Sequence, residues 1–188
     1  MDQKKLEQAA RLIIEAVGED PEREGLLETP RRFAEMVAEQ LAYAAVPNEE
    51  IARAFDKTFS SPESGMVVVK DISLFSHCEH HIALMYNMKA AVGYIPRGRV
   101  IGLSKIARIA DAVSKRLQIQ ERIGADIRDI MERITGAGDV IVLLEGEHSC
   151  MTARGIRKPG TLTRTISASG RFRTCLLYTS PSPRDSTS

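Results

Sequence analysis

Side chains that bind transition metals are concentrated at two points of the sequence. Three of the four histidines and one of the three cysteines lie in the run HCEHH at residues 77–81, and the remaining histidine is two residues from a second cysteine in His148-Ser149-Cys150. Thiolate and imidazole are ligands that zinc prefers. Because two such clusters rarely arise by chance, we interpret them as the two halves of one metal site.

Cys78, His81 and Cys150 form the simplest ligand set. A Cys-x-x-His spacing lets one turn present two ligands to one ion, and Cys150 joins them from a segment about 70 residues further along the chain. Three protein ligands leave the fourth tetrahedral position open to a water whose pKa falls to about 7, which is the pattern of a catalytic site. A fourth ligand, His80 or His148, would instead close the site as a structural one. A further alternative is two buried free cysteines beside unrelated histidines.

Two histidines next to these ligands are candidates for proton transfer. His148 and Cys150 are two residues apart, so on a strand their side chains would share a face and His148 would enter the metal pocket. His80 adjoins a ligand in the same way. A histidine titrates near neutral pH, which suits a general acid or base beside an activated water. The alternative for each is a purely structural histidine.

An anionic group would have to be bound by separate side chains, because the sequence contains neither a P-loop nor a GxGxxG motif. Free N–H groups and the helix dipole favour anions at a helix start. The candidates are Ser104, Lys105, Arg108 and Arg154. A solvated helix face is the simpler interpretation of these residues.

Gln120 and Glu121 open the next predicted helix. A carboxylate can accept hydrogen bonds from both the ring N–H and the exocyclic amine of guanine, which adenine does not offer. Glu121 is therefore a candidate for guanine recognition, or more simply a favourable acid in a first helical turn.

The elements that must position these residues change from helical to extended patterns along the chain. Thr29-Pro30 is a helix start signal, with Thr29 as the cap. Apolar periods of three and four predict helices, β-branched runs predict strands, and Pro and Gly mark a connector. The predicted helices cover 5–17, 31–45, 106–117 and 119–134, the connector covers 46–65, and the strands cover 66–77, 81–96, 139–144, 147–153 and 161–169.

This order predicts an α+β domain after a helical N-terminal arm. The β-β-α-α-β-β sequence of elements is typical of an antiparallel four-stranded sheet with helices on one face. Because such a sheet has two open edges, we expect subunits to pair edge to edge.

The composition excludes several classes of protein. Basic and acidic residues nearly balance, 26 against 25, so no basic excess is present to bind a nucleic-acid backbone. No segment approaches the roughly 20 apolar residues of a membrane span, and residues 1–20 form an amphipathic helix rather than a signal peptide. Three scattered cysteines do not make a disulfide framework. We therefore expect a cytoplasmic protein without nucleic-acid or membrane partners.

Residues 175–188, CLLYTSPSPRDSTS, have no helical or strand period and follow abruptly after SGRFRT. They resemble the translation of a transposon-type sequencing adapter. We interpret them as a non-native tail, the alternative being a natural disordered tail, and we exclude Cys175 from the ligand set.

Four motifs, SHCEHH, GYIPRGRVIGLSKIARI, RLQIQER and HSCMTARGI, occur in this order. Together they resemble the signatures of the type I GTP cyclohydrolases, over a stretch from about Leu26 to Phe172. The resemblance implies the tunnelling fold, with subunits joined into rings, two rings stacked as a homodecamer, and active sites between subunits. It implies a Zn²⁺ enzyme that opens the guanine imidazole ring of GTP, releases formate and recyclises the product to 7,8-dihydroneopterin triphosphate, the first step of pterin and folate synthesis.

The resemblance also implies a role for each candidate residue. The family's zinc ligands match Cys78, His81 and Cys150, and its two catalytic histidines match His80 and His148. Its guanine-recognising residues match Gln120 and Glu121. Its ribose and triphosphate contacts match Ser104, Lys105, Arg108 and Arg154. His77 stands at a position that the motif does not fix and receives no role.

The resulting division of the chain has three parts: 1–65, the helical arm and connector; 66–174, the catalytic tunnelling-fold domain; and 175–188, the tail. Family members continue past the GRF segment into a C-terminal helix, which we expect this domain to lack.

Two rival functions remain. One rival is a fold relative, a nitrile-reducing enzyme of the queuosine pathway or a pterin synthase, and the ligand set and HxCxxARG argue against it. The other rival is a non-catalytic zinc module, against which the near-zero net charge argues.

Overall fold

The structure is a computed structural model that describes residues 1–174. The predicted tail, with Cys175, lies outside the described residues. Residues 1–44 form one compact unit, and a second begins at Ala45, so the predicted division at residue 65 stays a prediction. In the described part of the chain, no helix is both long enough and apolar enough to cross a membrane.

The N-terminal unit contains α1 (Gln3–Ala16) and α2 (Thr29–Gln40), and the buried face of α1 includes Ala10 and Ile14. The prediction that Thr29 caps α2 is wrong, because Glu28 is the N-cap and Thr29 is the first helical residue. The predicted helix end at residue 45 is also too late, since α2 ends at Gln40 and residues 41–45 form a turn.

The predicted connector, 46–65, contains two elements that its Pro and Gly content concealed. The first is α3 (Asn48–Ala54), which starts directly after Pro47 and buries Ile51. The second is β1 (Thr58–Ser60), which pairs antiparallel with β4 (Arg99–Ile101) in a separate two-stranded sheet. Both are short, and short elements of mixed polarity give little periodic signal.

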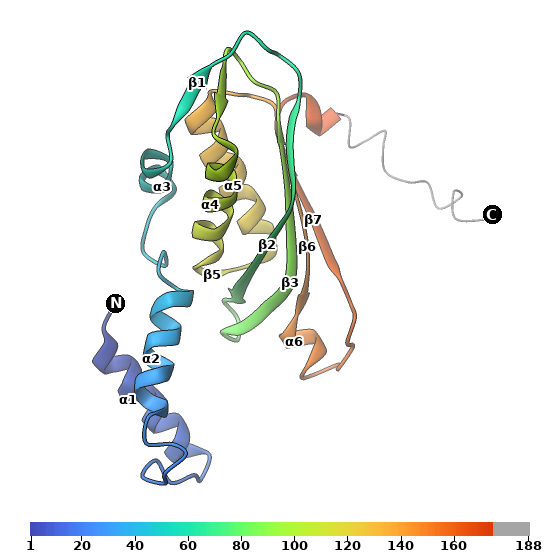
Figure 1. Ribbon diagram of the computed structural model, residues 1–188. Coiled ribbons are helices and arrows are strands. Elements are labelled where there is room, and N and C mark those ends of the chain that lie inside the picture. The colour runs from blue at the N-terminus through green and yellow to red at the C-terminus, as the bar shows by residue number, and fades with distance from the viewer. Residues whose placement is uncertain (175–188) are drawn as a thin grey trace, which may run out of the picture. The chain divides into compact units, whose positions relative to one another are not determined.

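The main sheet contains the four predicted antiparallel strands and one more. The long strands are β2 (Val67–Cys78), β3 (Ala83–Tyr94), β6 (Val140–His148) and β7 (Thr163–Ala168), and β5 (Leu117–Gln118) adds two residues parallel to the end of β2. The order is β5-β2-β3-β6-β7. Figure 1 shows the strands running side by side along the length of this unit. The predicted α+β class is therefore confirmed.

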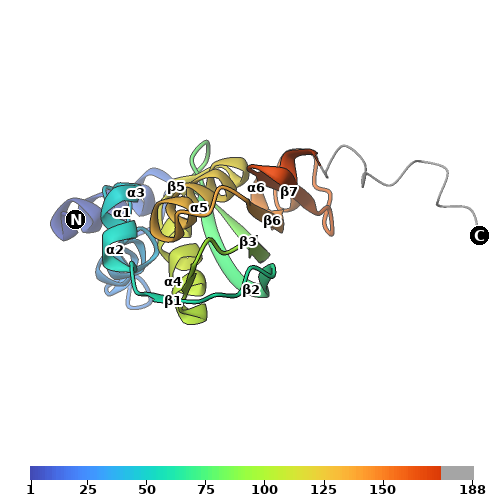
Figure 2. The same cartoon turned by 90° about the horizontal axis from the view of Figure 1, so that it is seen from above.

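Two helices, α4 (Leu103–Ser114) and α5 (Gln120–Thr135), cover one face of the sheet, as Figure 2 shows from above. α4 packs on β2, and α5 packs on β6 and β7. Their buried faces carry isoleucines at the predicted spacing of three and four, which meet methionine and β-branched residues of the sheet. Fully buried members of this core are Ile106, Ile109, Ile123, Ile127, Ile130, Met85, Met88 and Val92.

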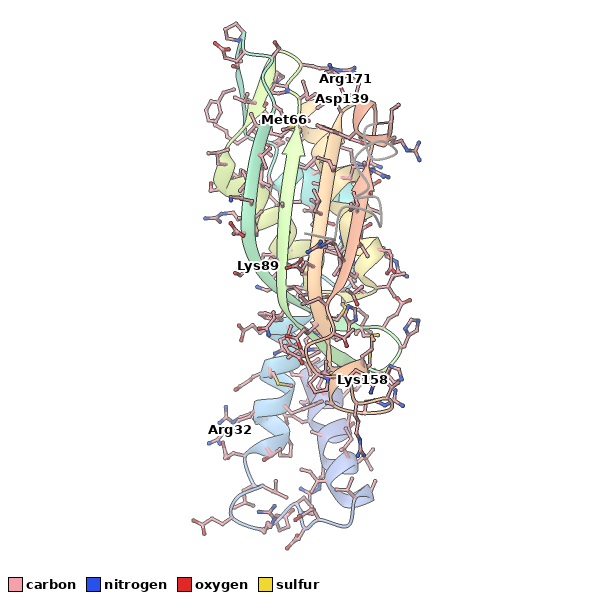
Figure 3. All side chains as sticks on the ribbon, turned by 90° about the vertical axis from the view of Figure 1, so that its right-hand side faces the viewer. Arg32, Met66, Lys89, Asp139, Lys158 and Arg171 are labelled. Carbon is pink, nitrogen blue, oxygen red and sulfur yellow. The ribbon has the colours of Figure 1, made fainter. Side chains whose placement is uncertain are left out.

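The sheet has two distant ends, which matter for the site. At one end Cys78 pairs with Ala83 and Met85 pairs with His148. At the other end Tyr94 pairs with Val140, and twelve residues of β3, about 40 Å of strand, lie between the ends. Figure 3 shows Lys158 at the first end, beside α6 (Ser149–Thr152), and Met66, Asp139 and Arg171 at the second.

One strand prediction is wrong. The segment 147–153 does not form a strand of its own: β6 continues to His148, and the chain then turns into the helical turn α6. The ladder between β3 and β6 ends at the Met85–His148 pair, and β3 continues from there to Ala83 paired with β2 alone.

Asp139 anchors the segment that follows β7 at the second end of the sheet. Its side chain is only 6% exposed. It accepts hydrogen bonds from the Arg171 backbone N–H at 2.8 Å and from the Arg171 guanidinium at 3.1 and 3.2 Å. These bonds, the backbone one first, hold the pKa of the Asp139 carboxyl below its ordinary value.

This shift predicts how stability depends on acid pH. The folded chain binds the Asp139 proton less readily than the unfolded chain, so the stabilisation is complete above the unfolded pKa, about 4, and is lost as the pH falls through the lowered folded pKa. An Asp139→Asn variant should therefore have a lower free energy of unfolding than the unmodified chain at pH 7, and should lose less of it on acidification. Urea unfolding of both proteins from pH 7 to pH 3 measures this. Parallel pH profiles for the two proteins would contradict this role of Asp139.

Candidate metal and substrate site

Cys78, His81 and Cys150 converge at the first end of the sheet, which we call the metal end. Cys78 ends β2, and the turn that leads to β3 brings His81 back, with its N–H donating to the Cys78 carbonyl at 3.3 Å. Cys150 arrives from α6, because β6 pairs with β3. One ligand atom from each side chain lies within 4.8 Å of the other two, with Cys78 buried, Cys150 half-buried and His81 exposed.

The donor set fits a transition-metal ion. A tetrahedral zinc site, with Zn–S near 2.3 Å and Zn–N near 2.0 Å, holds its ligand atoms about 3.5–4 Å apart, which is within the 4.8 Å that bounds the separations in this cluster. Burial, followed by the neighbouring Cys78 thiol, raises the pKa of Cys150, as expected for two sulfurs crowded together without a cation. A metal ion would relieve that crowding by binding both as thiolates.

His80 borders this cluster and His148 lies at the same end of the sheet, and the catalytic role of both stays a prediction. The Nδ1 atom of His80 lies 3.6 Å from Cys78 Sγ. His148 is the last residue of β6, but Cys150 is not on a strand, so the argument from strand alternation is wrong even though both residues are at the same end of the sheet.

Gln120 orients His148. The Gln120 amide is buried, and its nitrogen donates to the backbone carbonyls of Thr163 at 2.9 Å and Leu144 at 3.3 Å. Its oxygen must then face His148 Nε2, which is 2.9 Å away. Because an amide oxygen only accepts, Nε2 of His148 carries the proton and Nδ1 is left as the basic nitrogen. Burial lowers the pKa of His148, and the nearby Glu121 carboxylate partly opposes this.

Arg154 and Glu121 also lie at this end of the sheet. Arg154 follows α6 and donates from Nη1 to His81 Nε2 at 2.9 Å. Glu121 is exposed in the first turn of α5, next to Gln120. The cluster thus has a guanidinium at His81, and the Glu121 carboxylate is near enough to His148 to affect its pKa.

Ser104, Lys105 and Arg108 are not brought to this cluster within one chain. They lie in the first two turns of α4, whose start is tied to the second end of the sheet because Ile101 N–H donates to the Tyr94 hydroxyl at 3.1 Å. Only the last residue of α4, Ser114, approaches the metal end, where its carbonyl accepts from the Ser76 hydroxyl at 2.7 Å. Ten helical residues, about 15 Å, separate Ser104 from Ser114.

Other residues at the site were not singled out from the sequence. Arg122 forms a two-pronged ion pair with Glu79, at 2.6 and 3.1 Å, and so joins α5 to the turn between Cys78 and His81. Glu79 lies inside the HCEHH run, which was the available signal. His77 is buried, and its Nδ1 atom has no hydrogen-bond partner among the described residues; burial lowers its pKa.

Comparison with known proteins identifies the family. A sequence profile described as GTP cyclohydrolase I matches residues 6–176. This chain belongs to the GTP cyclohydrolase I family. It is 56% identical to GTP cyclohydrolase 1 of Clostridium acetobutylicum over 178 residues, covering 92% of this chain and 91% of that protein. It is 55% identical to GTP cyclohydrolase 1 of Clostridium beijerinckii over 180 residues, covering 93% of this chain and 91% of that protein.

Membership of the GTP cyclohydrolase I family confirms the resemblance drawn from the four motifs, and with it the tunnelling fold. Among solved structures, an archaeosine synthase QueF-Like in the apo form superposes with a TM-score of 0.45 and 18% identity, over 58% of this chain and 96% of that chain. That likeness is too distant to carry an inference about this GTP cyclohydrolase I family member.

The cluster geometry predicts which side chains determine the metal affinity of this chain. The chain should bind one divalent transition-metal ion through Cys78, His81 and Cys150. Cys150→Ser or His81→Ala should weaken binding by more than the roughly 10–100-fold that loss of an outer-shell partner costs, measured by equilibrium dialysis against Co²⁺ or Zn²⁺. Ser149→Ala, in the same turn, is the matched control and should bind normally. Equal affinity in all four proteins would contradict the assignment of the ligands.

Proposed function

We propose that the chain hydrolyses GTP to 7,8-dihydroneopterin triphosphate with release of formate, as the first step of pterin and folate synthesis. The observation that carries the proposal is a group of two cysteines and one histidine that could hold a metal ion, with two further histidines at the same end of the sheet, in a chain of the GTP cyclohydrolase I family. The exposed imidazole of His81 indicates a cluster open to a substrate rather than closed as a structural site.

Zn²⁺ is the ion that this donor set fits best, since thiolate and imidazole together select it over Mg²⁺ or Ca²⁺. Cys78, His81 and Cys150 would hold it. When bound, the ion supplies Lewis acidity that makes water a nucleophile at neutral pH. The remaining work of binding, orientation and proton transfer belongs to the side chains around it.

His80 and His148 are the proton-transfer groups of the proposal. Opening the imidazole ring of guanine requires a proton on a ring nitrogen as its bond to carbon 8 breaks, and one of these histidines would deliver it. Since Gln120 engages His148 Nε2 at 2.9 Å, His148 would exchange protons through Nδ1. The lowered pKa keeps the neutral form of His148 available at neutral pH.

Guanine recognition is assigned to Glu121 with Gln120. Glu121 is the exposed carboxylate of the pair and has the acceptor pattern that matches the guanine ring N–H and amine. The Gln120 side chain already makes hydrogen bonds to both the sheet and His148. Gln120 would therefore contribute to the guanine pocket chiefly by fixing its wall and orienting His148.

The triphosphate would be bound by Arg154 of one chain and by Ser104, Lys105 and Arg108 of a second copy. The distance between the start of α4 and the metal end supports a site shared between subunits, because one chain does not bring the two groups together. Open sheet edges favour the same assembly, in which copies pair into rings and the rings stack as a homodecamer. We place this enzyme in the cytoplasm, acting without nucleic acid or membrane.

Activity tests the chemistry. Zinc-loaded chain incubated with GTP should release formate and yield a pterin that fluoresces after oxidation. Cys150→Ser should lose both signals, and His148→Ala should slow formate release by about 10²–10⁴-fold, the usual contribution of a general acid or base. Tight zinc binding without formate release or GTP affinity would contradict the proposal and favour a non-catalytic zinc module.

Mixing two inactive variants tests the shared site. Cys150→Ser and Lys105→Ala should each be inactive alone, whereas a co-expressed mixture should recover up to about a quarter of wild-type activity, because random assembly leaves that fraction of sites intact. Cys150→Ser mixed with His81→Ala is the matched control and should stay inactive, since both changes fall on the same group of ligands. No recovery in mixed oligomers would place the whole site within one chain.

A further inference from the structure

A β-bulge lies next to the metal end of the sheet. Tyr86 pairs with Glu147 and Lys89 pairs with Glu145, so two residues of β3 stand opposite Gly146 alone. Asn87, in the bulge, has a left-handed backbone with φ 50°. A Cβ at Gly146 would lie 2.7 Å from Met88 Cγ, so the bulge requires glycine at this position.

The bulge directs polar groups of β3 onto Glu147. Asn87 Nδ2 donates to Glu147 Oε1 at 2.9 Å, and the Tyr86 hydroxyl donates to Oε2 at 3.3 Å. Thr152 can then donate to the Tyr86 oxygen, 2.9 Å away. The backbone N–H of Gly160 also donates to Oε2, at 3.3 Å. We call these five residues, Tyr86, Asn87, Glu147, Thr152 and Gly160, the Glu147 clamp.

The segment that carries Cys150 depends on such contacts. α6 has four residues, and a single helical turn is not stable by itself. The chain from Ala153 to Gly160 is exposed throughout. The clamp fixes this segment at Thr152, two residues after Cys150, and again at Gly160, while His148 fixes its beginning through Gln120.

We propose that Glu147 is a positioning residue that holds the Cys150 thiolate, and Arg154 four residues later, in the place where the metal ion and the substrate meet. The proposal rests on the proposed metal function and adds a residue outside the HxCxxARG motif to it. Asn87, chiefly, lowers the pKa of Glu147, which keeps the carboxylate ionised and able to accept from all its donors at neutral pH. Residues that orient a metal ligand typically affect metal affinity by about 10–100-fold.

Cobalt binding to the full-length chain tests the clamp. Co²⁺ bound to thiolates gives a sulfur-to-metal charge-transfer band, and its visible bands report the coordination geometry. Glu147→Ala should weaken Co²⁺ affinity by about 10–100-fold, in competition with a chelator, and should change the visible bands. Glu147→Gln keeps an acceptor oxygen for Asn87 but replaces the oxygen that accepts from Tyr86 and Gly160 with a donor, so it should recover only part of the affinity. Tyr86→Phe removes the hydroxyl that links Glu147 to Thr152 but leaves the bonds from Asn87 and Gly160, so it should cause a smaller loss.

Glu145→Ala is the matched control. Glu145 lies two residues earlier on β6 and pairs with Arg164, 3.1 Å away, without touching the Cys150 segment, so its loss should leave Co²⁺ affinity and spectrum unchanged. Normal Co²⁺ binding by Glu147→Ala, with or without a lower unfolding temperature, would overturn the positioning role. If that variant does not fold, normal affinity and spectrum in Tyr86→Phe would overturn it. Failure of the wild-type chain itself to bind Co²⁺ would instead refute the metal function, and the clamp with it.

Discussion

The antiparallel pairing of β3 with β6 is the constraint on which the site depends. Cys78 and Cys150 are far apart in sequence, and only the ladder from Tyr94–Val140 to Met85–His148 brings their segments together. The register of that ladder is fixed by burial, because a slip of one residue would turn Val142 and Leu144 away from the helices. The apolar core and the metal cluster are thus two results of the same strand alignment.

The sequence was sufficient to single out the candidate ligands, but not to predict the geometry of the site. Ligand types and motif spacing are local properties, so Cys78, His81 and Cys150 could be singled out without a fold, and the regular isoleucine spacing was enough to predict α4 and α5. The end of β6 was misplaced because the polar segment 145–153 does not reveal where pairing with β3 stops.

Contacts between distant segments could not be predicted from the sequence, for a related reason. Glu147 meets Asn87 only because a bulge adds a residue to β3, and Arg122 meets Glu79 only because α5 starts above the turn after β2. Neither pair has a characteristic spacing. The distance between α4's first turn and the cluster likewise became visible only when the helix was placed along the sheet, and it supports the proposal of sites shared between subunits.

The exposure of His81 has a consequence for how such a protein matures. The sheet and its helices are packed through apolar side chains, and the two segments that bear the cysteines are fastened by hydrogen bonds and ion pairs of the polypeptide itself. Folding therefore does not have to wait for the ion, in contrast to small zinc domains whose only core is the metal. Because the His81 imidazole is exposed, the proposed ligand group can be reached from solvent in the folded chain, and an ion could enter it without unfolding.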